Sequence, residues 1–214
     1  MEVSIFSPKK SVISAIEHPN LGTVVVLVLI PIILSIIGTI LNGFALNPLE
    51  IIFMIVRNFF SLLLLSATLY VLFHVIKGSD LAKGKFSSVL SGVSLIYVAI
   101  IILTILGIIL TPMAFSKPLL GVVKQSQAKT ISADTAIQQM DLILSKDPKA
   151  VNETMLLVSF VLGAIVAIYG LIILYRCVSE LFELKGFRNL AVLIVWLAGF
   201  SIIYGLISTV ITFL

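Results

Sequence analysis

The feature that most constrains this chain is the repetition of long apolar segments. Each reaches the length of about 20 residues that a helix needs to cross the hydrocarbon core of a bilayer. Lipid offers no water to pair with backbone N–H and C=O groups, so each segment should be helical. The expected fold class is an all-α polytopic membrane protein in which residues 1–214 form a single domain. The predicted transmembrane helices are residues 21–41, 51–76, 88–112, 155–178 and 189–213.

Composition supports this class and excludes several others. Of the 214 residues, 60% are hydrophobic and 11% are charged, whereas a soluble domain typically carries about 25% charged residues. The net charge is +4, but the Lys and Arg residues are scattered and form no basic run suited to nucleic acid. The single cysteine, Cys177, excludes an intramolecular disulfide, and no Cys/His spacing matches a zinc site. No cofactor or metal is expected.

Several boundaries carry the residues that begin and end helices. Asn47, Pro48 and Glu50 supply an N-cap, a proline at the first helical position and a carboxylate in the first turn. Asp147 and Pro148 repeat the cap-then-proline order and predict a helix that enters the fourth span. Gly43 and Gly186 stand where C-terminal caps are expected.

Basic residues near the span ends predict the orientation, since cytoplasmic loops carry an excess of Lys and Arg. This places the chain in the cell membrane as a multi-pass protein, with its N-terminus in the cytoplasm and its C-terminus outside. Five further lysines fall in the long external segment 113–154, but long segments follow the charge rule poorly. The residues that mark the cytoplasmic side are Lys9, Lys10, Lys77, Lys83, Lys85, Arg176, Lys185 and Arg188.

The segment before the first span is expected to be a short interfacial helix over residues 8–17, with Ser7 as its cap. Lys9 and Lys10 can reach anionic headgroups, and the apolar residues Val12, Ile13 and Ile16 share one face. A frayed terminus is the alternative. A cleaved signal peptide is not expected, because the apolar stretch is long enough to span and no clear cleavage site follows it.

The external segment is expected to contain one amphipathic helix that begins after Ser132. Its apolar side should lie on the outer membrane surface or on the tops of the spans. That side comprises Ile137, Met140, Ile143 and Leu144.

Small residues predict two places where helices approach closely. Ser159, Gly163 and Ala167 recur every four residues on the fourth span, and Ser88 and Gly92 repeat that spacing on the third. Either set could pack the monomer core or support a homo-oligomer.

The second span carries the candidate polar site. Glu50, Arg57, Ser61 and Thr68 point in directions within roughly 20° of one another at 100° per residue. An arginine that faces lipid near the bilayer centre costs roughly 2.5–3.5 kcal/mol, which favours an inward or pore-facing stripe. Outward snorkelling of Arg57 is the alternative. Expected partners of Arg57 are Glu50, Thr104 or Thr111, or carbonyl groups freed by Pro31.

No sequence motif for catalysis is present. The chain has no nucleophile–base motif, phosphate-binding loop, dinucleotide fingerprint or His-Glu-x-x-His pattern. Its two histidines, His18 and His74, lie near predicted membrane boundaries, as do Tyr70, Tyr169 and Tyr175, which suit an interfacial aromatic belt. The expectation is a protein without enzymatic activity.

Three stretches resemble the Yip-domain family of five-span proteins, which interact with Ypt/Rab small GTPases. They are FSPKKSVISAIEHPNLG, AKGKFSSVLSGVSLIY and LKGFRNLAVLIVWLAG. In the eukaryotic members the resemblance implies work in vesicle traffic. This chain lacks the long N-terminal region and the Asp-Leu-Tyr-Gly-Pro motif of those members, so it is more similar to the prokaryotic branch and small-GTPase binding is not expected.

Two functions are favoured on the sequence, ahead of a membrane-embedded enzyme, for which two histidines and few intramembrane carboxylates supply little acid–base material. The first is an adaptor or organiser of membrane partners, in contact with the lipid bilayer, a partner membrane protein or a second copy. The alternative is a small-solute or ion transporter or channel, which requires polar groups that converge inside the helix bundle.

Overall fold

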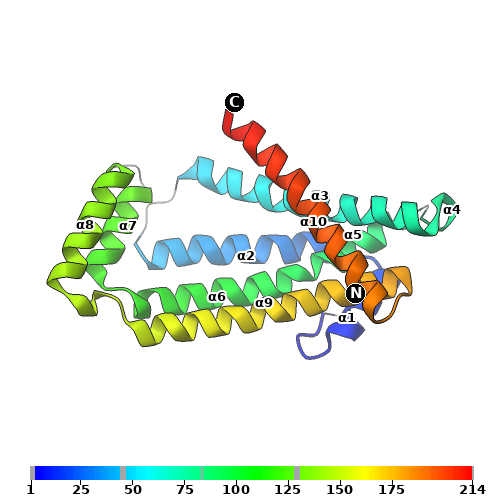
Figure 1. The fold of residues 1–214 in the computed structure, drawn as a ribbon, viewed down its shortest axis with the longest axis horizontal. Helices are drawn as coiled ribbons and strands as arrows, with labels where there is room; N and C mark the ends of the chain where they lie inside the picture. The colour runs from blue at the N-terminus through cyan, green and yellow to red at the C-terminus, as the bar shows by residue number, and fades with distance from the viewer. Residues whose placement is uncertain (1–2, 44–46, 83, 128–130, 214) are drawn as a thin grey trace.

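The computed structural model describes residues 3–43, 47–82, 84–127 and 131–213, and the chain there is almost entirely helical (Figure 1). In order, the helices are α1 (Pro8–Glu17), α2 (Leu21–Leu41), α3 (Pro48–Lys77), α4 (Ser79–Ala82), α5 (Phe86–Ser94), α6 (Ile96–Ala114), α7 (Lys117–Gln127), α8 (Ala133–Lys146), the 3-10 turn η1 (Pro148–Ala150), α9 (Glu153–Phe182) and α10 (Phe187–Phe213).

Within the described ranges, five helical segments are long and apolar enough to cross a membrane, and they confirm the all-α polytopic fold. The first span has the predicted bounds, and the other four begin two or three residues earlier than predicted. Each added first turn contains a polar residue, which is Glu50, Ser87, Glu153 or Arg188. The segments are Leu21–Leu41, Pro48–Lys77, Phe86–Ala114, Glu153–Phe182 and Phe187–Ile207.

Side-chain caps confirm two of the predicted helix starts. The Asn47 Oδ1 accepts a hydrogen bond from the Leu49 N–H at 3.0 Å, ahead of Pro48 and Glu50. The Ser132 Oγ accepts from the Thr135 N–H at 3.1 Å and begins α8. Ser7 precedes α1 as predicted, but its side chain makes no capping hydrogen bond.

Two other boundary predictions are wrong. Asp147 and Pro148 begin only the turn η1, and α9 starts later, where the Asn152 Oδ1 accepts from the Met155 N–H at 3.1 Å. At the far end of α9, Glu183 rather than Gly186 adopts the left-handed conformation after the last helical residue, with φ 55°. Gly186, with φ 61°, stands just before α10. Gly43 follows α2 with φ 69°, as the prediction of a C-terminal glycine requires.

The third span was predicted as one helix, but it is divided at Leu95 into α5 and α6. The Ser94 hydroxyl donates to the Ser91 carbonyl at 2.8 Å, and the Leu95 N–H turns instead to the Gly92 carbonyl at 3.3 Å. A serine hydroxyl that donates to a carbonyl in the preceding turn competes with the backbone N–H that would bond to this carbonyl in a regular α-helix. The sequence shows the serines but not which carbonyl they take.

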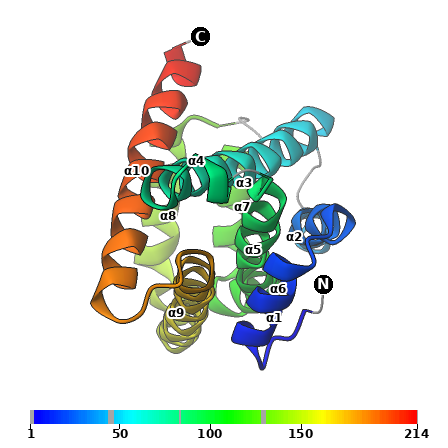
Figure 2. The ribbon, with the colours of Figure 1, turned by 90° about the vertical axis from the view of Figure 1, so that its right-hand side faces the viewer.

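Helices α2, α3, α6 and α9 run along the long axis of the molecule, and α10 crosses α3 obliquely (Figures 1 and 2). The segments outside the spans cover the two ends. The end that Figure 2 faces holds α1, α4 and the link between α9 and α10. At the opposite end, α7 and α8 form a hairpin that stands across the spans. The prediction for the external segment 113–154 is thus half right, since α8 forms and α7 was missed.

Backbone hydrogen bonds hold the hairpin at its base. Phe115 and Val151 form an antiparallel bridge, flanked by hydrogen bonds of 2.8 Å from the Ser116 N–H to the Ala150 carbonyl and from the Asn152 N–H to the Ala114 carbonyl. The hairpin therefore leaves and re-enters the membrane region at one point between α6 and α9.

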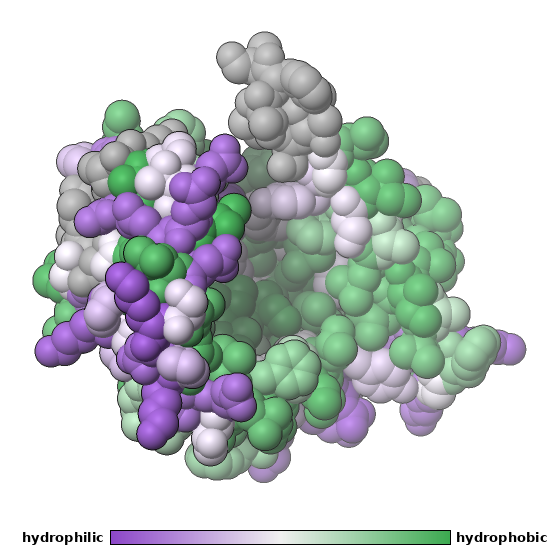
Figure 3. Space-filling view, turned by 60° about the vertical axis from the view of Figure 1, so that its left-hand side comes forward, coloured by the Kyte–Doolittle hydropathy of each residue, from purple (hydrophilic) through white to green (hydrophobic). Residues whose placement is uncertain are grey.

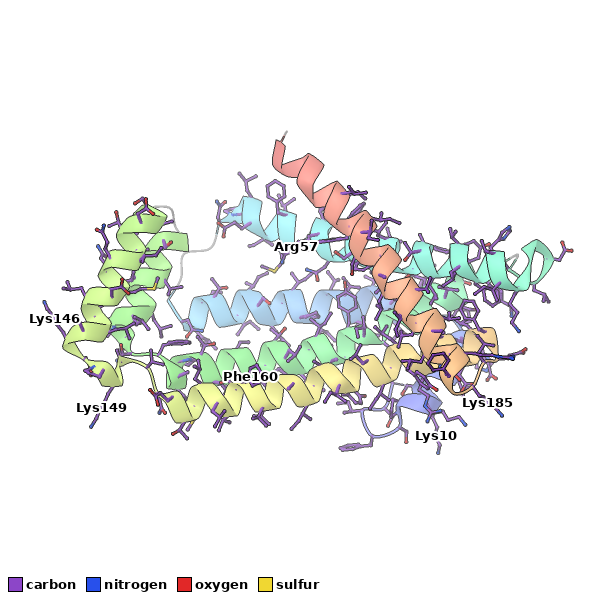
Figure 4. The ribbon with its side chains drawn as sticks, in the orientation of Figure 1. Lys10, Arg57, Lys146, Lys149, Phe160 and Lys185 are labelled. Carbon is purple, nitrogen blue, oxygen red and sulfur yellow. The ribbon has the colours of Figure 1, made fainter. Side chains whose placement is uncertain are left out.

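The two ends contain different parts of the predicted charge pattern. Figure 4 shows Lys10 and Lys185 at one end and Lys146 and Lys149 at the other. This separation agrees with a path in which the predicted cytoplasmic and external segments face opposite sides. Which side is cytoplasmic stays a prediction.

Cysteine labelling tests the orientation. Asp80 in α4 and Asp141 in α8 are exposed at opposite ends, and the native Cys177 is fully buried. We expect a membrane-impermeant maleimide added to intact cells to label an Asp141→Cys variant and not an Asp80→Cys variant. Both should react after permeabilisation. The opposite pattern would reverse the orientation, and labelling of both from one side would contradict the five-span path.

Candidate functional site

The four residues of the predicted polar stripe on α3 do not share one environment. Glu50 and Arg57 are exposed, Ser61 is half-buried, and Thr68 is half-buried in a contact with α10. The stripe therefore does not face the bundle interior as a unit. Its deep end is part of the core, and its charged end lies outside it.

Thr68 belongs to a polar contact that sequence reasoning missed. The Trp196 Nε1 of α10 donates to the Leu65 carbonyl at 3.0 Å and to the Thr68 Oγ1 at 3.1 Å. Only 2% of Trp196 is exposed. Tryptophan usually lies at the membrane–water interface, so the position of Trp196 well inside a predicted span was the available signal. The contact fixes the first part of α10 against the middle of α3.

Arg57 lies on the part of α3 nearer the hairpin (Figure 4). It is nine residues from the start of α3, about 14 Å at 1.5 Å per residue. Its guanidinium makes no hydrogen bond or ion pair with any residue the structure describes. Of the expected partners, Thr104 is engaged elsewhere, because its Oγ1 donates to the Ile100 carbonyl at 2.8 Å. A buried, partnered Arg57 is thus not found within the single chain.

Around Arg57 lies a surface that we name the open face: residues 48–61 of α3 and residues 197–207 of α10. Neither stretch contains a buried residue. The buried residues of α3 begin at Leu62, and up to residue 207, where the described side chains of α10 end, the last buried one is Trp196. Figure 3 shows an apolar hollow between the polar hairpin and the neighbouring helices. The large apolar side chains exposed on the open face are Leu49, Ile52, Phe53, Val56, Phe60, Ile202, Ile203 and Leu206.

One of the two predicted small-residue contacts forms. Gly92 is buried, and a Cβ there would lie 2.9 Å from the Cys177 Sγ of α9 and 3.3 Å from the Ile16 Cγ1 of α1. Ser88 is buried on the same helix. The close contact therefore joins α1, α5 and α9 within one chain.

The Ser159, Gly163 and Ala167 set does not form a close contact. Ala167 is exposed, and a Cβ on Gly163 would meet no atom within 4 Å. Gly163 and Ser159 instead line an apolar cavity of about 200 Å³ between α6 and α9. The close approach on α9 occurs at Gly170, where a Cβ would lie 3.0 Å from the Ile96 Cδ1. Gly170 lies outside the predicted run of small residues, so that spacing could not identify it.

The leading helix has the predicted bounds and a different packing. Val12 is fully buried in the core, Ile13 and Ile16 are half-buried, and Lys9 and Lys10 are exposed. Its apolar face therefore packs partly on α5 and α9 rather than on lipid alone. Tyr169, predicted as part of an aromatic belt, donates to the Ile5 carbonyl at 3.0 Å and holds the segment before α1.

Among the residues that the structure describes, no three His, Cys, Asp or Glu side chains gather in a group that could hold a metal ion. His18 and His74 are both exposed. The polar residues buried in the core are Ser11, Ser66, Ser88, Ser91, Ser94 and Asn189.

Comparison with protein-family models, curated proteins and solved structures finds no match to this chain. What the fold itself establishes is an integral membrane protein with multiple apolar helices of spanning length.

Proposed function

We propose that this chain is a non-enzymatic membrane adaptor that organises other membrane proteins by accepting a partner's transmembrane helix on the open face. The observation that carries the proposal is the set of large apolar side chains exposed on residues 48–61 and 197–207, together with the exposed charge of Arg57. The first stretch contacts the bundle only on one side, where Met54, Ile55 and Phe59 are half-buried against the core and the Tyr97 hydroxyl of α6 donates to the Asn58 carbonyl at 2.8 Å. The kinship with Yip-domain proteins is part of the same proposal.

Arg57 gives the open face its selectivity. Charged side chains within spans pair with one another or with backbone carbonyl groups, because an unpaired charge is costly in lipid. Arg57 has no such acceptor among the described residues of its own chain. A partner helix that places a carboxylate or a free carbonyl near Arg57 would supply one. Phosphate groups of lipids compete for the same guanidinium, because the Cα–Cβ bond of Arg57 tilts toward the start of α3 and hence toward the membrane surface.

The described part of the chain has few of the features that a solute transporter needs. A transport path requires polar groups that converge on a cavity inside the bundle. The cavity between α6 and α9 is lined mainly by leucine, glycine and alanine, and the buried polar residues are serines and one asparagine. These observations support the adaptor over the transporter. Flux measurements on vesicles containing the purified chain test the alternative.

Site-directed photocrosslinking in native membranes tests the adaptor proposal. We expect crosslinkers placed at Phe53 and Ile202, on the open face, to capture a protein. Matched crosslinkers at Phe160 and Ile168 of α9, which are equally exposed but outside the open face, should capture lipid only. Phe160 is labelled in Figure 4. Lipid adducts at all four positions, or protein adducts at all four, would contradict the proposal.

Removal of the charge tests the selectivity of Arg57. We expect Arg57→Leu to lower the protein adduct at Phe53 about threefold to tenfold, as polar contacts between transmembrane helices contribute about 0.6 to 1.4 kcal/mol. The stability of the isolated chain should not fall, since Arg57 contacts no polar group within it. Lys149→Leu is the charge-matched control and should leave the adduct unchanged. An unchanged adduct in Arg57→Leu would assign the guanidinium to lipid phosphate instead.

A further inference from the structure

The segment before α1 exposes apolar side chains, which the described residues leave wholly or partly uncovered. Phe6 is 96% exposed, and Ile5 and Val3 are 50% and 41% exposed. Residues 3–10 contain no carboxylate and two lysines, Lys9 and Lys10, both exposed. A segment of this kind is unfavourable in water and suits the boundary between acyl chains and headgroups.

Hydrogen bonds fix this segment in place. The Tyr169 hydroxyl of α9 donates to the Ile5 carbonyl at 3.0 Å. The Ser4 N–H donates to the Ser11 Oγ at 2.8 Å, and the Ser11 hydroxyl donates back to the Ser4 carbonyl at 3.2 Å. Ser11 and Val12 are themselves buried. The exposure of Phe6 is thus a property of an anchored loop and not of a loose terminus.

The anchor at Tyr169 sets the depth of the loop. The 30 residues of α9 measure about 45 Å, and the hydrocarbon core is about 30 Å thick. A centred α9 therefore extends about 7 Å beyond the hydrocarbon at each end. Tyr169 lies 13 residues before the end of α9, about 20 Å, so its level is about 12 Å inside the hydrocarbon.

The rest of α1 rises toward the surface. Pro8 lines a small cavity with Leu95 and Ile173, whereas Ile16 near the end of α1 approaches Gly92 and hence Cys177. Cys177 lies four residues closer to the end of α9 than Ile173, about 6 Å. The loop is accordingly the deepest part of the N-terminal segment, and the lysines stand between it and the surface.

We propose that residues Val3–Phe6 form an apolar loop that inserts among the acyl chains of the leaflet beside α1, and that Lys9 and Lys10 bind the phosphate groups of anionic phospholipids in that leaflet. Charge complementarity selects an anionic lipid, since the nearest described carboxylate on this helix is Glu17, at its opposite end. The lysine stems are long enough to reach headgroups from below.

Spin labels test the depth in the full chain reconstituted in phosphatidylcholine vesicles that contain phosphatidylglycerol. Phe6→Cys places a label on the loop, and Phe187→Cys, 83% exposed at the start of α10, is the control at a span end. Cys177 is fully buried, and the parent chain measures its background labelling. We expect the Phe6 label to favour collisions with oxygen over a water-soluble nickel chelate, and the Phe187 label to be shallower. A Phe6 label as open to the nickel chelate as the Phe187 label would overturn the inserted loop and mark a surface in water.

Lipid binding tests the lysines. We expect the double variant Lys9→Gln/Lys10→Gln to lose preference for phosphatidylglycerol over phosphatidylcholine by about fivefold per lysine in native mass spectrometry, since each basic side chain near an anionic surface contributes about 1 kcal/mol. Lys146→Gln/Lys149→Gln, at the other end of the molecule, should keep the preference. An equal loss in both double variants, or none in the first, would overturn the lysine assignment.

The variant Phe6→Ser tests the loop separately, because it removes no contact of α1. It should reduce the oxygen exposure of a spin label at Ile5 and leave the preference for anionic lipid intact. An unchanged oxygen exposure would count against insertion.

Discussion

Replacing Gly92 by valine is expected to lower the free energy of unfolding by about 2 kcal/mol and to loosen α1 from the bundle. The added Cβ would meet the Cys177 Sγ at 2.9 Å and the Ile16 Cγ1 at 3.3 Å. Cys177 is fully buried and cannot turn aside into open space. The least costly response is a shift of α1, which makes few other contacts with the spans than those to α5 and α9. The free energy is measured by reversible unfolding in mixed micelles, and the position of α1 by the mobility of a spin label at Lys10.

Gly163→Val is the matched control. It introduces the same side chain into a transmembrane helix, but a Cβ at Gly163 meets no atom within 4 Å and points to the cavity between α6 and α9. We expect a change within about 0.5 kcal/mol and no change at Lys10. Equal destabilisation by the two variants would mean that valine disturbs any span here, and the close contact at Gly92 would lose its support.

These two glycines also show how far the sequence could specify the packing. Both stand in a four-residue spacing of small residues, and that spacing says only that a close approach is sterically allowed. Whether a neighbour uses it depends on the direction in which each helix leaves its loop. The break at Leu95 sets that direction for α5, and it arises from one hydrogen bond of Ser94 that no periodicity reveals.

The spans themselves were predictable because lipid imposes length and hydropathy on every helix that crosses it. Asn47 and Ser132 were predictable as caps since their side chains act on a backbone N–H two or three residues away. The prediction that Asp147 begins a helix into the fourth span was wrong, because a capping residue does not determine how many turns follow it.

The candidate polar site was predictable in part. The shared helical direction of these residues follows from their spacing alone, and spacing cannot show that the buried residues of α3 begin only at Leu62. Thr68 therefore lies in the core and Arg57 does not, although both lie on one stripe. The path of α10 beside this stripe is set by Trp196, which lies 131 and 128 residues along the chain from its two acceptors, Leu65 and Thr68.

Trp196 is accordingly the residue whose loss should most change the open face. We expect Trp196→Ala to lower the free energy of unfolding by about 3 kcal/mol, the lower end for loss of a buried aromatic side chain, because lipid rather than water surrounds the bundle. Without the hydrogen bonds to Leu65 and Thr68, α10 loses its contact with the middle of α3. Ile202→Ala, on the exposed part of the same helix, should change the free energy by less than about 0.5 kcal/mol. Unfolding of the purified chain in mixed micelles measures both, in the absence of any partner.

A double-mutant cycle separates the hydrogen bond from the packing. Trp196→Phe keeps a ring and removes the Nε1 donor, and Thr68→Val removes the Oγ1 acceptor at 3.1 Å. We expect a coupling energy of about 0.6 kcal/mol, the average for side-chain hydrogen bonds between transmembrane helices. Trp196→Phe should cost more than Thr68→Val, because it also removes the bond of 3.0 Å to the Leu65 carbonyl. Additive effects would assign the stability of this contact to shape alone. In that case Trp196→Phe should also leave the crosslinks at Phe53 and Ile202 unchanged. If the hydrogen bond sets the angle of α10, Trp196→Phe should instead weaken the crosslink at Ile202 more than the crosslink at Phe53.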